Sequence, residues 1–224
     1  MASKIIYEDI KKKILHMDLL PGLLISELDL CERYGISRTP TREAIKALSK
    51  EGLLEVKPHI GTFVSKIDIN KVSDTIYIRR CLELSIVSEL CSNFNPSYAL
   101  PLQQILSKQQ SLINSKESED LAWDFMQLDN DFHAKLFELA GKQGIWQTIC
   151  SLNQHYIRFR IMLIKDNNDS INDLFNQHNI ILKCLLKRDA EKLSDIVSEH
   201  ITDGFQKCGE MMINNTSFFI LPDE

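Results

Sequence analysis

The first third of the chain alternates short amphipathic segments with turn signals. Isoleucines at helical spacing predict a first helix over about residues 3–17. Leu20-Pro21-Gly22 ends this helix, and Ser26 is a typical N-cap for a second short helix that continues to Tyr34. A turn that begins with glycine, over residues 35–37, leads into a third segment. The pattern therefore predicts two short helices joined by a tight turn.

The third segment, GISRTPTREAIKALSKEG over residues 35–52, has two distinct faces. Its proline lies in the first turn of the predicted helix, where a missing backbone N–H costs little. At about 100° per residue, an apolar face separates from a basic and hydroxylated face. The apolar face holds Ala44, Ile45, Ala47 and Leu48, and the polar face holds Arg38, Thr39, Arg42, Lys46, Ser49 and Lys50. A helix of this kind is suited to the major groove of DNA.

Two short apolar segments after this helix predict a β-hairpin. Residues 53–56 and 61–64 have the composition of strands, and the turn Lys57-Pro58-His59-Ile60 lies between them. A hairpin at this position is called a wing. Three helices and a wing predict a winged helix-turn-helix domain over residues 1–68.

From Asn70 onward glycine is rare and apolar positions repeat at helical spacing. Short breaks divide this region into six predicted helices, at about 70–93, 97–114, 118–140, 144–165, 170–187 and 190–212. Six helices with short joints form an antiparallel bundle, so the predicted fold class is mainly α. We expect the all-helical domain to span residues 69–213. The tail over 214–224 is apolar in part. The sequence leaves two alternatives for it, docking on a partner and docking on the bundle.

Composition adds a separation of charge between the two predicted domains. The 224 residues carry a net charge of -5, which is unusual for a protein that binds nucleic acid. Residues 1–68 hold 11 Lys and Arg against 10 Asp and Glu, whereas residues 69–224 hold 15 against 21. The acidic excess therefore lies entirely in the bundle, and the basic face of the third helix is a local feature.

Other features of the composition exclude several classes of protein. An apolar content of 44% is normal for a globular protein with a core. The sequence has no run of about 18 apolar residues, and its N-terminus is too charged for a signal peptide, so we expect a cytoplasmic protein without membrane segments. Six scattered cysteines without a C-x-x-C pair favour reduced thiols over a zinc ribbon or a disulfide scaffold.

Five short elements follow one another between Leu19 and Val64: Pro-Gly, Leu-x-Glu, Ser-Arg-Thr-Pro-x-Arg-Glu-Ala, Glu-Gly-Leu and Gly-x-x-Val. In this order and spacing they resemble the DNA-binding domain of GntR-family transcriptional regulators. Thr41 departs from the family pattern, in which an aliphatic residue such as valine is usual. The resemblance implies sequence-specific DNA binding by the N-terminal domain.

The helical remainder carries a second set of matching residues. These are Arg79 and Glu83, the run Leu128-Asp129-Asn130-Asp131-Phe132-His133, and the distal pair His178 and His200. They are similar to the FCD effector domain of the FadR-like branch of the same family. With six predicted helices, the domain is closer to the shorter type of FCD domain.

Four of these residues are candidate metal ligands. Asp129 and His133 are four residues apart and project from one helix face, while His178 and His200 are on the last two predicted helices and can meet them in the core. From spacing alone, histidines satisfied within the core are an equal alternative. The resemblance implies metal binding, because FCD domains that bind metal use an Asp and three His at these positions. This donor set suits Zn, Ni, Co or Mn, with zinc the first choice, and does not suit Ca.

The metal has two possible roles, and one of them involves a ligand. Four protein ligands form a closed structural zinc site, or they leave two positions of a six-coordinate metal open for water or a carboxylate effector. We expect Arg79 to bind such a carboxylate, since a guanidinium holds it in a bidentate fork. The alternative is a salt bridge from Arg79 to Glu83. Both roles are compatible if Arg79 pairs with Glu83 in the empty pocket and is recruited when a ligand binds. Arg158 and Arg160 are weaker candidates.

The expected DNA contacts come from the third helix and the wing. We expect Arg38 and Arg42 to read bases, because arginine binds guanine through two hydrogen bonds. We expect the helix residues Thr39, Thr41 and Lys46 to contact phosphates. In the wing, contacts to the DNA backbone or the minor groove are expected from Lys57, His59 and Gly61. A solvated loop residue is the alternative for His59.

Together these features predict a homodimeric transcriptional regulator rather than an enzyme. It would act as a repressor, as is usual in the resembled family, bind an inverted-repeat operator, and respond to a small organic acid. Two alternatives are open. The metal itself could be the signal, or the Asp and His cluster could be the centre of a metal-dependent hydrolase with Glu83 as the nearby base.

Overall fold

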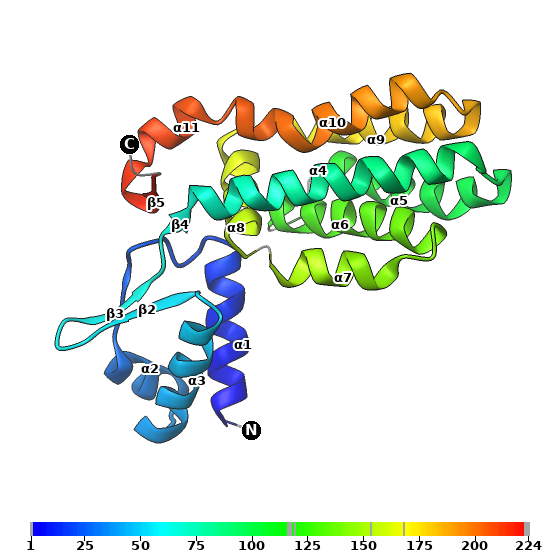
Figure 1. The fold of residues 1–224 in the computed structure, drawn as a ribbon. Coiled ribbons are helices and arrows are strands. Elements are labelled where there is room, and N and C mark those ends of the chain that lie inside the picture. Colours follow the sequence, from blue (N-terminus) through cyan, green and yellow to red (C-terminus); the bar gives the residue numbers. More distant parts are fainter. Residues whose placement is uncertain (1, 116–117, 119, 153, 168, 222–224) are drawn as a thin grey trace.

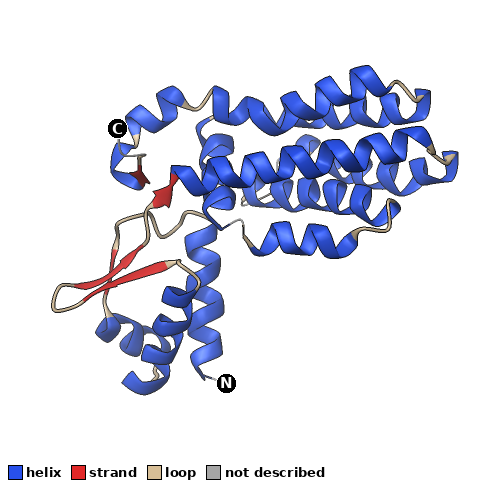
Figure 2. Ribbon diagram, viewed as in Figure 1, coloured by secondary structure: helices blue, strands red, loops and turns tan. Residues whose placement is uncertain are grey.

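A computed structural model describes residues 2–115, 118, 120–152, 154–167 and 169–221. The chain forms a small N-terminal module with a hairpin and a larger helical body, which lie at an angle to each other (Figure 1). Each part has its own hydrophobic core. The predicted fold class is confirmed: a mainly helical chain with an N-terminal winged helix-turn-helix (Figure 2).

The N-terminal module contains three helices and a three-stranded sheet. The helices are α1 (Ala2–Leu15), α2 (Glu27–Tyr34) and α3 (Arg38–Lys50), and the strands are β1 (Leu24–Ile25), β2 (Leu54–Lys57) and β3 (Gly61–Val64). The sheet is antiparallel in the order β1-β3-β2. The sequence pattern missed β1, because a strand of two residues has no periodicity to detect.

Local chemistry explains the turn between α2 and α3. The Ser26 hydroxyl caps α2 by accepting the Asp29 amide, with the two atoms 3.2 Å apart. Gly35 ends the helix in the left-handed conformation, at φ 62°, which glycine adopts without steric cost. The turn directs α3 across the module, with Ala44, Ile45 and Leu48 buried in its core.

The larger body contains eight α-helices in the described residues. They are α4 (Ile69–Ser92), α5 (Ala99–Asn114), α6 (Leu121–Leu139), α7 (Gln143–Ser151), α8 (Gln154–Asp166), α9 (Ser170–Lys187), α10 (Ala190–Gln206) and α11 (Gly209–Asn214). A 3-10 turn (η1, Pro96–Tyr98) precedes α5, and a second (η2, Thr216–Phe218) follows α11. α10 packs along both α4 and α9, and α5 packs between α6 and α9.

Two helices that the sequence predicted as continuous are divided in the structure. The helix expected over 144–165 is split between α7 and α8, because α8 turns out of the bundle direction to stand at the junction with the N-terminal module (Figure 1). The helix expected over 190–212 is split between α10 and α11, with Lys207 and Cys208 at the break. The prediction of six helices was therefore too low.

The C-terminal tail docks on its own chain. Strand β5 (Phe219–Ile220) pairs in parallel with β4 (Ile67–Asp68), the segment that links the N-terminal module to α4. The Phe219 side chain is buried in the core of the helical body. Residues 222–224 of the predicted tail lie outside the described residues.

Two further sequence features can be compared with the structure. None of the helices in the described part of the chain combines the length and the apolar character needed to cross a bilayer. All six cysteines are free thiols.

Candidate metal centre and nucleic-acid interface

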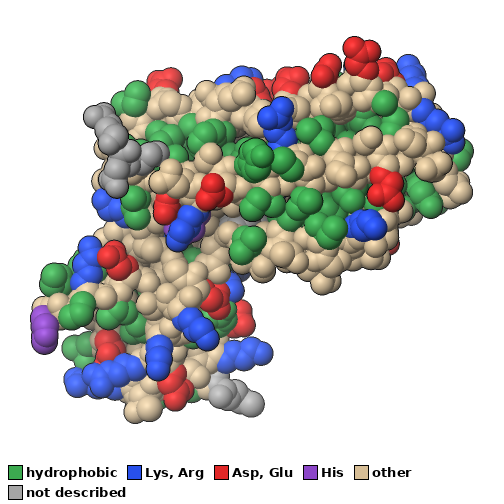
Figure 3. All heavy atoms as spheres, viewed as in Figure 1, with side chains coloured by type: hydrophobic (Ala, Val, Ile, Leu, Met, Phe, Trp, Pro, Cys, Tyr) green, Lys and Arg blue, Asp and Glu red, His purple; other side chains and the backbone are tan. Residues whose placement is uncertain are grey.

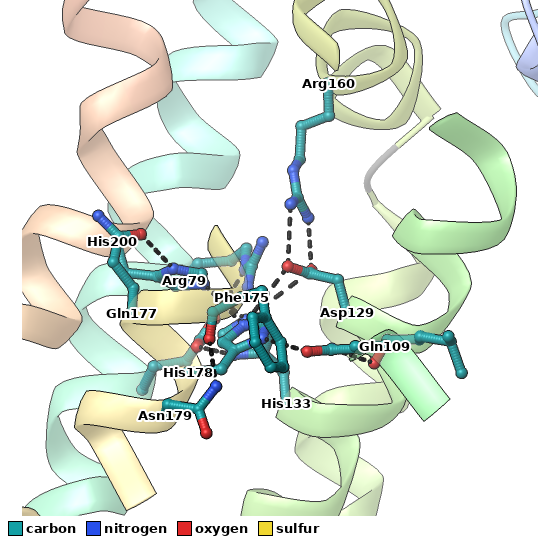
Figure 4. Close-up of polar contacts among 12 residues, drawn as sticks. Arg79, Gln109, Asp129, His133, Arg160, Phe175, Gln177, His178, Asn179 and His200 are labelled. Carbon is teal, nitrogen blue, oxygen red and sulfur yellow. Dashed lines mark hydrogen bonds and ion pairs between the residues drawn. The ribbon is translucent and has the colours of Figure 1, made fainter. Parts of the chain in front are cut away.

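The four predicted metal ligands meet in the core of the helical body. Asp129 and His133 come from α6, His178 from α9 and His200 from α10 (Figure 4). One ligand atom from each lies within 4.8 Å of all the others, and all four residues are buried. The Nε2 atoms of His133 and His178 lie 3.0 and 3.2 Å from Nε2 of His200.

Each histidine is held at its other ring nitrogen by an oxygen acceptor. Nδ1 of His178 lies 3.1 Å from Oε1 of Gln109, and Nδ1 of His200 lies 2.8 Å from Oε1 of Gln177. The Gln109 amide is oriented in turn, because its Nε2 donates to the Leu128 carbonyl. Acceptors at Nδ1 favour the tautomer with hydrogen on that nitrogen, which leaves Nε2 with a lone pair.

The third histidine has a charged partner. Nδ1 of His133 lies 2.6 Å from Oε2 of Glu83, the carboxylate–histidine arrangement that commonly supports a metal ligand. Burial lowers the pKa of His178 to about 3, and burial with the two neighbouring imidazoles lowers the pKa of His200 well below its usual value. These two rings are therefore neutral near pH 7, which is the form that binds a metal.

This geometry fits a transition metal. Three Nε2 lone pairs that face one another cannot hydrogen bond with one another, so the cluster needs a cation or a proton between them. Zinc–nitrogen bonds of about 2.0–2.1 Å place tetrahedral ligand nitrogens about 3.3 Å apart, close to the separations found here. Asp129 completes the set, with its oxygens 3.5 Å from Nε2 of His178 and 3.8 Å from Nε2 of His133.

Asp129 is also paired with an arginine from α8. The Arg160 guanidinium donates from Nη1 and Nη2 to the two carboxylate oxygens, at 2.6 and 3.0 Å (Figure 4). Although burial opposes ionisation, the Arg160 charge holds the pKa of Asp129 well below its usual value. Asp129 is therefore a buried carboxylate that stays ionised.

Arg79, the predicted effector residue, lies in a second buried network. Its Nε donates to Glu83 Oε1 at 2.6 Å, and its Nη1 donates to the Tyr156 hydroxyl at 2.7 Å. Burial alone would raise the pKa of Glu83, but the charges of Arg79 and His133 lower it to about 2. Nη2 of Arg79 has no partner among the described residues. The salt-bridge alternative is thus present, and one donor remains for an anion.

A cavity of about 330 Å³ opens beside the cluster. Its lining includes Arg160, His200, Gln177 and Tyr156, together with other residues of α10 and residues of α11. Arg79 is not among the lining residues, so the arginine that faces this space is Arg160. Its volume is at the lower end of the range for small-molecule sites, about 300–1,000 Å³.

The basic face of α3 is exposed, as its period predicted. Arg38, Thr39, Arg42 and Lys46 all have exposed side chains. Nε of Arg42 lies 2.9 and 3.0 Å from the two carboxylate oxygens of Glu27 on α2, which fixes the direction of its guanidinium. In Figure 3, Lys and Arg side chains gather on the N-terminal module, while Asp and Glu follow the edge of the helical body formed by α9 and α10.

One predicted DNA contact is wrong. Thr41 is completely buried, and its hydroxyl donates to the Ser37 carbonyl at 3.1 Å. Its position three residues before Ala44 and four before Ile45 places it on the core side of α3. This threonine therefore packs inside the module and cannot present its side chain to a phosphate.

The wing places its three predicted residues at or near the tip of a hairpin. Lys57 and His59 are exposed, and His59 has a positive φ of 62° in the turn between β2 and β3. Gly61 has a φ of 154°, and a Cβ at this position would lie 2.7 Å from Cδ1 of Leu24. Contacts of these residues with DNA stay a prediction.

Several parts of the centre had no detectable sequence signal. Gln109, Gln177 and Tyr156 are far apart in sequence and have residue types that are common on helix surfaces. Their positions depend on how the helices pack. Among the residues that support the metal ligands, Arg79 and Glu83 were the pair that the sequence predicted, from their spacing of four residues.

Comparison with known proteins identifies two matching domains. The family model described as "Bacterial regulatory proteins, gntR family" matches residues 2–64, and the one described as "FCD domain" matches residues 74–203. The chain is 29% identical over 214 residues to the HTH-type transcriptional repressor RspR of Escherichia coli K12, covering 96% of this chain and 92% of that protein. It is 33% identical over 162 residues to an HTH-type transcriptional regulator in an unstable DNA locus of Streptomyces ambofaciens, covering 72% and 66%. The solved structure of E. coli McbR/YncC aligns with a TM-score of 0.66 at 20% identity, covering 94% of this chain and 98% of that one, which shows the shared fold.

Proposed function

Because the chain belongs to the GntR family of bacterial regulatory proteins and carries an FCD domain, we propose that it is a metal-dependent repressor that responds to a small carboxylate. In this proposal the winged module binds an operator, and the FCD domain holds a divalent metal and the effector. The single observation that supports it most strongly is the convergence of three Nε2 atoms and one carboxylate in a buried cluster. The repressor role is supported by the name of the relative RspR.

The metal would be held by Asp129, His133, His178 and His200. Zinc is our first choice, and nickel, cobalt and manganese suit the same nitrogen and oxygen donors. A metal of this kind supplies positive charge and open coordination positions for an anionic ligand. The proposal therefore combines the cofactor and the effector in one buried site.

The charge balance around the cluster supports an anionic effector. Two buried carboxylates, Glu83 and Asp129, are matched by two buried guanidinium groups, Arg79 and Arg160. A divalent ion would add two positive charges to a buried site that is otherwise neutral, and an uncompensated buried charge is costly. A small carboxylate in the cavity would reduce this cost. Arg160 would contact it from the cavity wall. Arg79 does not line this cavity, so its free Nη2 would reach the carboxylate only if the ligand recruits the arginine from its pairing with Glu83.

The proposal includes a homodimer formed by the helical body. Tyr77 and Cys81 are one turn apart on α4 and both exposed, with Tyr77 69% exposed, and the half-buried Leu84 follows them on the same face. Exposed apolar side chains along a long helix favour contact with a second copy of the chain. Two winged modules in a symmetric dimer would bind an inverted repeat. Replacing Tyr77 with Glu would reduce the dimer fraction measured by light scattering, and an unchanged dimer would remove α4 from the interface.

A selection experiment tests the proposed function directly. The full chain would be used to select duplexes from a random DNA pool, and the affinity for the selected duplex would then be measured with and without zinc and a panel of small carboxylates. We expect an inverted repeat to be selected and at least one carboxylate to weaken binding only when zinc is present. A carboxylate can shift operator affinity by no more than its differential affinity for the two arrangements of the modules.

The same experiment separates the two alternatives. Operator binding that responds to zinc and ignores every organic acid would favour the metal as the signal. Turnover of the same acids by zinc-loaded protein would favour a hydrolase. The engagement of Glu83 by Arg79 and His133 argues against its use as a free catalytic base.

A further inference from the structure

Helix α8 lies at the junction of the two parts of the chain and is tied to the winged module at both of its ends. At its first turn, Nε2 of Gln154 donates to Glu51 Oε2 at 3.1 Å. Near its last turn, Nζ of Lys165 donates to the main-chain carbonyl of His16 at 2.8 Å. Between them, Ile157 packs against the core of the winged module. α8 therefore carries the module together with the start of α6, where Asp120 and Trp123 contact His16.

The first half of α8 holds the linker between the two parts, which is the segment over residues 65–68. Arg158 donates from Nη1 to the Ser65 carbonyl at 2.6 Å and from Nη2 to the Ser65 hydroxyl at 3.3 Å. Nδ1 of His155 accepts the Asp68 amide at 3.1 Å. Burial, with the charge of Arg158, lowers the pKa of His155 to about 4, so its ring is a neutral acceptor. Two adjacent turns of one helix thus fix two linker residues.

Arg158 is unusual because it is buried without a counter-ion. Its side chain has no exposed surface, its Nε has no hydrogen-bond partner, and no carboxylate of the described residues pairs with it. Burial lowers its pKa to about 10. A buried arginine without an acid is costly for folding. The contact that this buried guanidinium makes in return is its hydrogen bond with the main chain of the linker.

The opposite face of α8 belongs to the metal and effector site. Arg160 is two residues after Arg158, so the two side chains leave a helix on different sides. Arg160 pairs with both oxygens of Asp129, and Tyr156 and Phe159 line the cavity beside it. A ligand on the Asp129 carboxylate or in the cavity has to share or displace the Arg160 guanidinium. Arg158 lies within one helical turn of Arg160, so it is close to any such displacement.

We propose that α8 couples the metal and effector site to the winged module, and that Arg158 is the positioning residue through which the coupling reaches the linker. The inference rests on the proposed function, because it assigns the route by which occupancy of that site changes the placement of the module. Helix α8 connects the two regions physically, because its Arg158 contacts the linker and its Arg160 contacts Asp129 of the metal site.

The test compares two arginine variants in the full chain. Arg158→Met removes the contact with the linker and also removes an unpaired buried charge, so we expect it to fold. Arg188→Met is the matched control, because Nη2 of Arg188 also donates to a main-chain carbonyl, that of Phe94 at 3.2 Å, in the turn region far from the linker. Hydrogen exchange of the peptide over residues 62–70 would be followed with and without ZnCl2, and zinc binding would be measured by calorimetry.

In the wild-type chain and in Arg188→Met, we expect zinc to change exchange of this peptide by about fivefold or more. In Arg158→Met, zinc should bind within about twofold of the wild-type affinity and change the exchange by less than about twofold. An equal change in Arg158→Met, or a wild-type chain that binds zinc with no change at the linker, would overturn the inference. A wild-type chain that does not bind zinc would overturn the proposed function instead. Arg158→Lys, which keeps the charge and loses the fork, takes the place of Arg158→Met if that variant fails to fold.

Discussion

The winged module and the centre of the helical body use charged side chains in opposite ways. On α3, Arg38 and Arg42 are exposed, and their suitability for DNA comes from accessibility to phosphates and base edges. In the body, Asp129 and His178 have no exposed surface, and their suitability for a metal comes from burial with matched partners. The comparison shows that exposed arginines suit a reading surface, whereas enclosed and partnered carboxylates and imidazoles suit a metal site. Each region can be tested separately from the other.

The largest expected effect is the loss of a metal ligand. His178→Ala should weaken zinc binding by at least about 100-fold, beyond the roughly 10–100-fold that loss of an outer-layer partner costs. Competition with a chromogenic chelator would measure it. The matched control is His59→Ala, which removes an exposed imidazole from the wing and should leave zinc affinity unchanged. Equal zinc affinity in wild type and His178→Ala would separate the cluster from metal binding.

The second prediction concerns the exposed face of α3. Arg42→Ala should reduce affinity for the selected duplex by about 1–3 kcal/mol, because it removes a side chain placed for bidentate base contact. Arg80→Ala removes an exposed arginine from α4 and is the control for net charge. Fluorescence anisotropy at fixed salt would measure both variants. If the two lose affinity equally, Arg42 has no specific part in DNA recognition.

The third prediction concerns the layer behind the metal ligands. Gln109→Ala should weaken zinc binding by about 10–100-fold, because Nδ1 of His178 loses the acceptor that fixes its ring. Gln110→Ala is the control, since Gln110 is adjacent, exposed, and bonded to Asn114. Calorimetric titration with ZnCl2 distinguishes the two. Matching affinities for both variants would show that His178 needs no orienting partner.

The smallest expected effect is a pH dependence confined to the helical body. His178 stays neutral in the folded chain until about pH 3, whereas an unfolded histidine takes up a proton near its ordinary pKa of about 6.5. Acid therefore favours the unfolded state below that pH, and zinc-free protein should lose about 1.4 kcal/mol of stability per pH unit for this histidine. Urea unfolding between pH 7 and 5 would measure the loss. A constant free energy of unfolding across this range would show that folding does not lower the pKa of His178.

The sequence predicted the winged module almost residue by residue, because its signals are local. The Ser26 cap, the Gly35 turn and the two faces of α3 all depend on residues within one or two helical turns of each other. The two-residue strand β1 was missed, and Thr41 is the second exception. The helical period places it toward the core, and its hydroxyl suggested a phosphate contact that burial rules out. For Thr41, the position on the helix determines the environment of the side chain, and the residue type does not.

The helical body was predicted less completely, because its site is assembled from distant segments. The four clustered ligands were found through the resemblance to FCD domains, whereas their spacing left a satisfied core as an equal alternative. Gln109 and Gln177 come from α5 and α9, and no pattern along the chain connects them to the histidines. The two-residue pairing of the tail with the linker, and the break that releases α8 toward the winged module, likewise depend on packing between remote segments.

The central claim is that the Asp and His cluster holds a metal, and a crystal of the full chain with anomalous data collected on both sides of the zinc, nickel, cobalt and manganese absorption edges tests it most directly. The account predicts one anomalous peak per chain, bound by a carboxylate oxygen of Asp129 and by Nε2 of His133, His178 and His200. Crystals soaked in ZnCl2 that show no peak at this cluster, with the four side chains bonded to one another or to water, would contradict it.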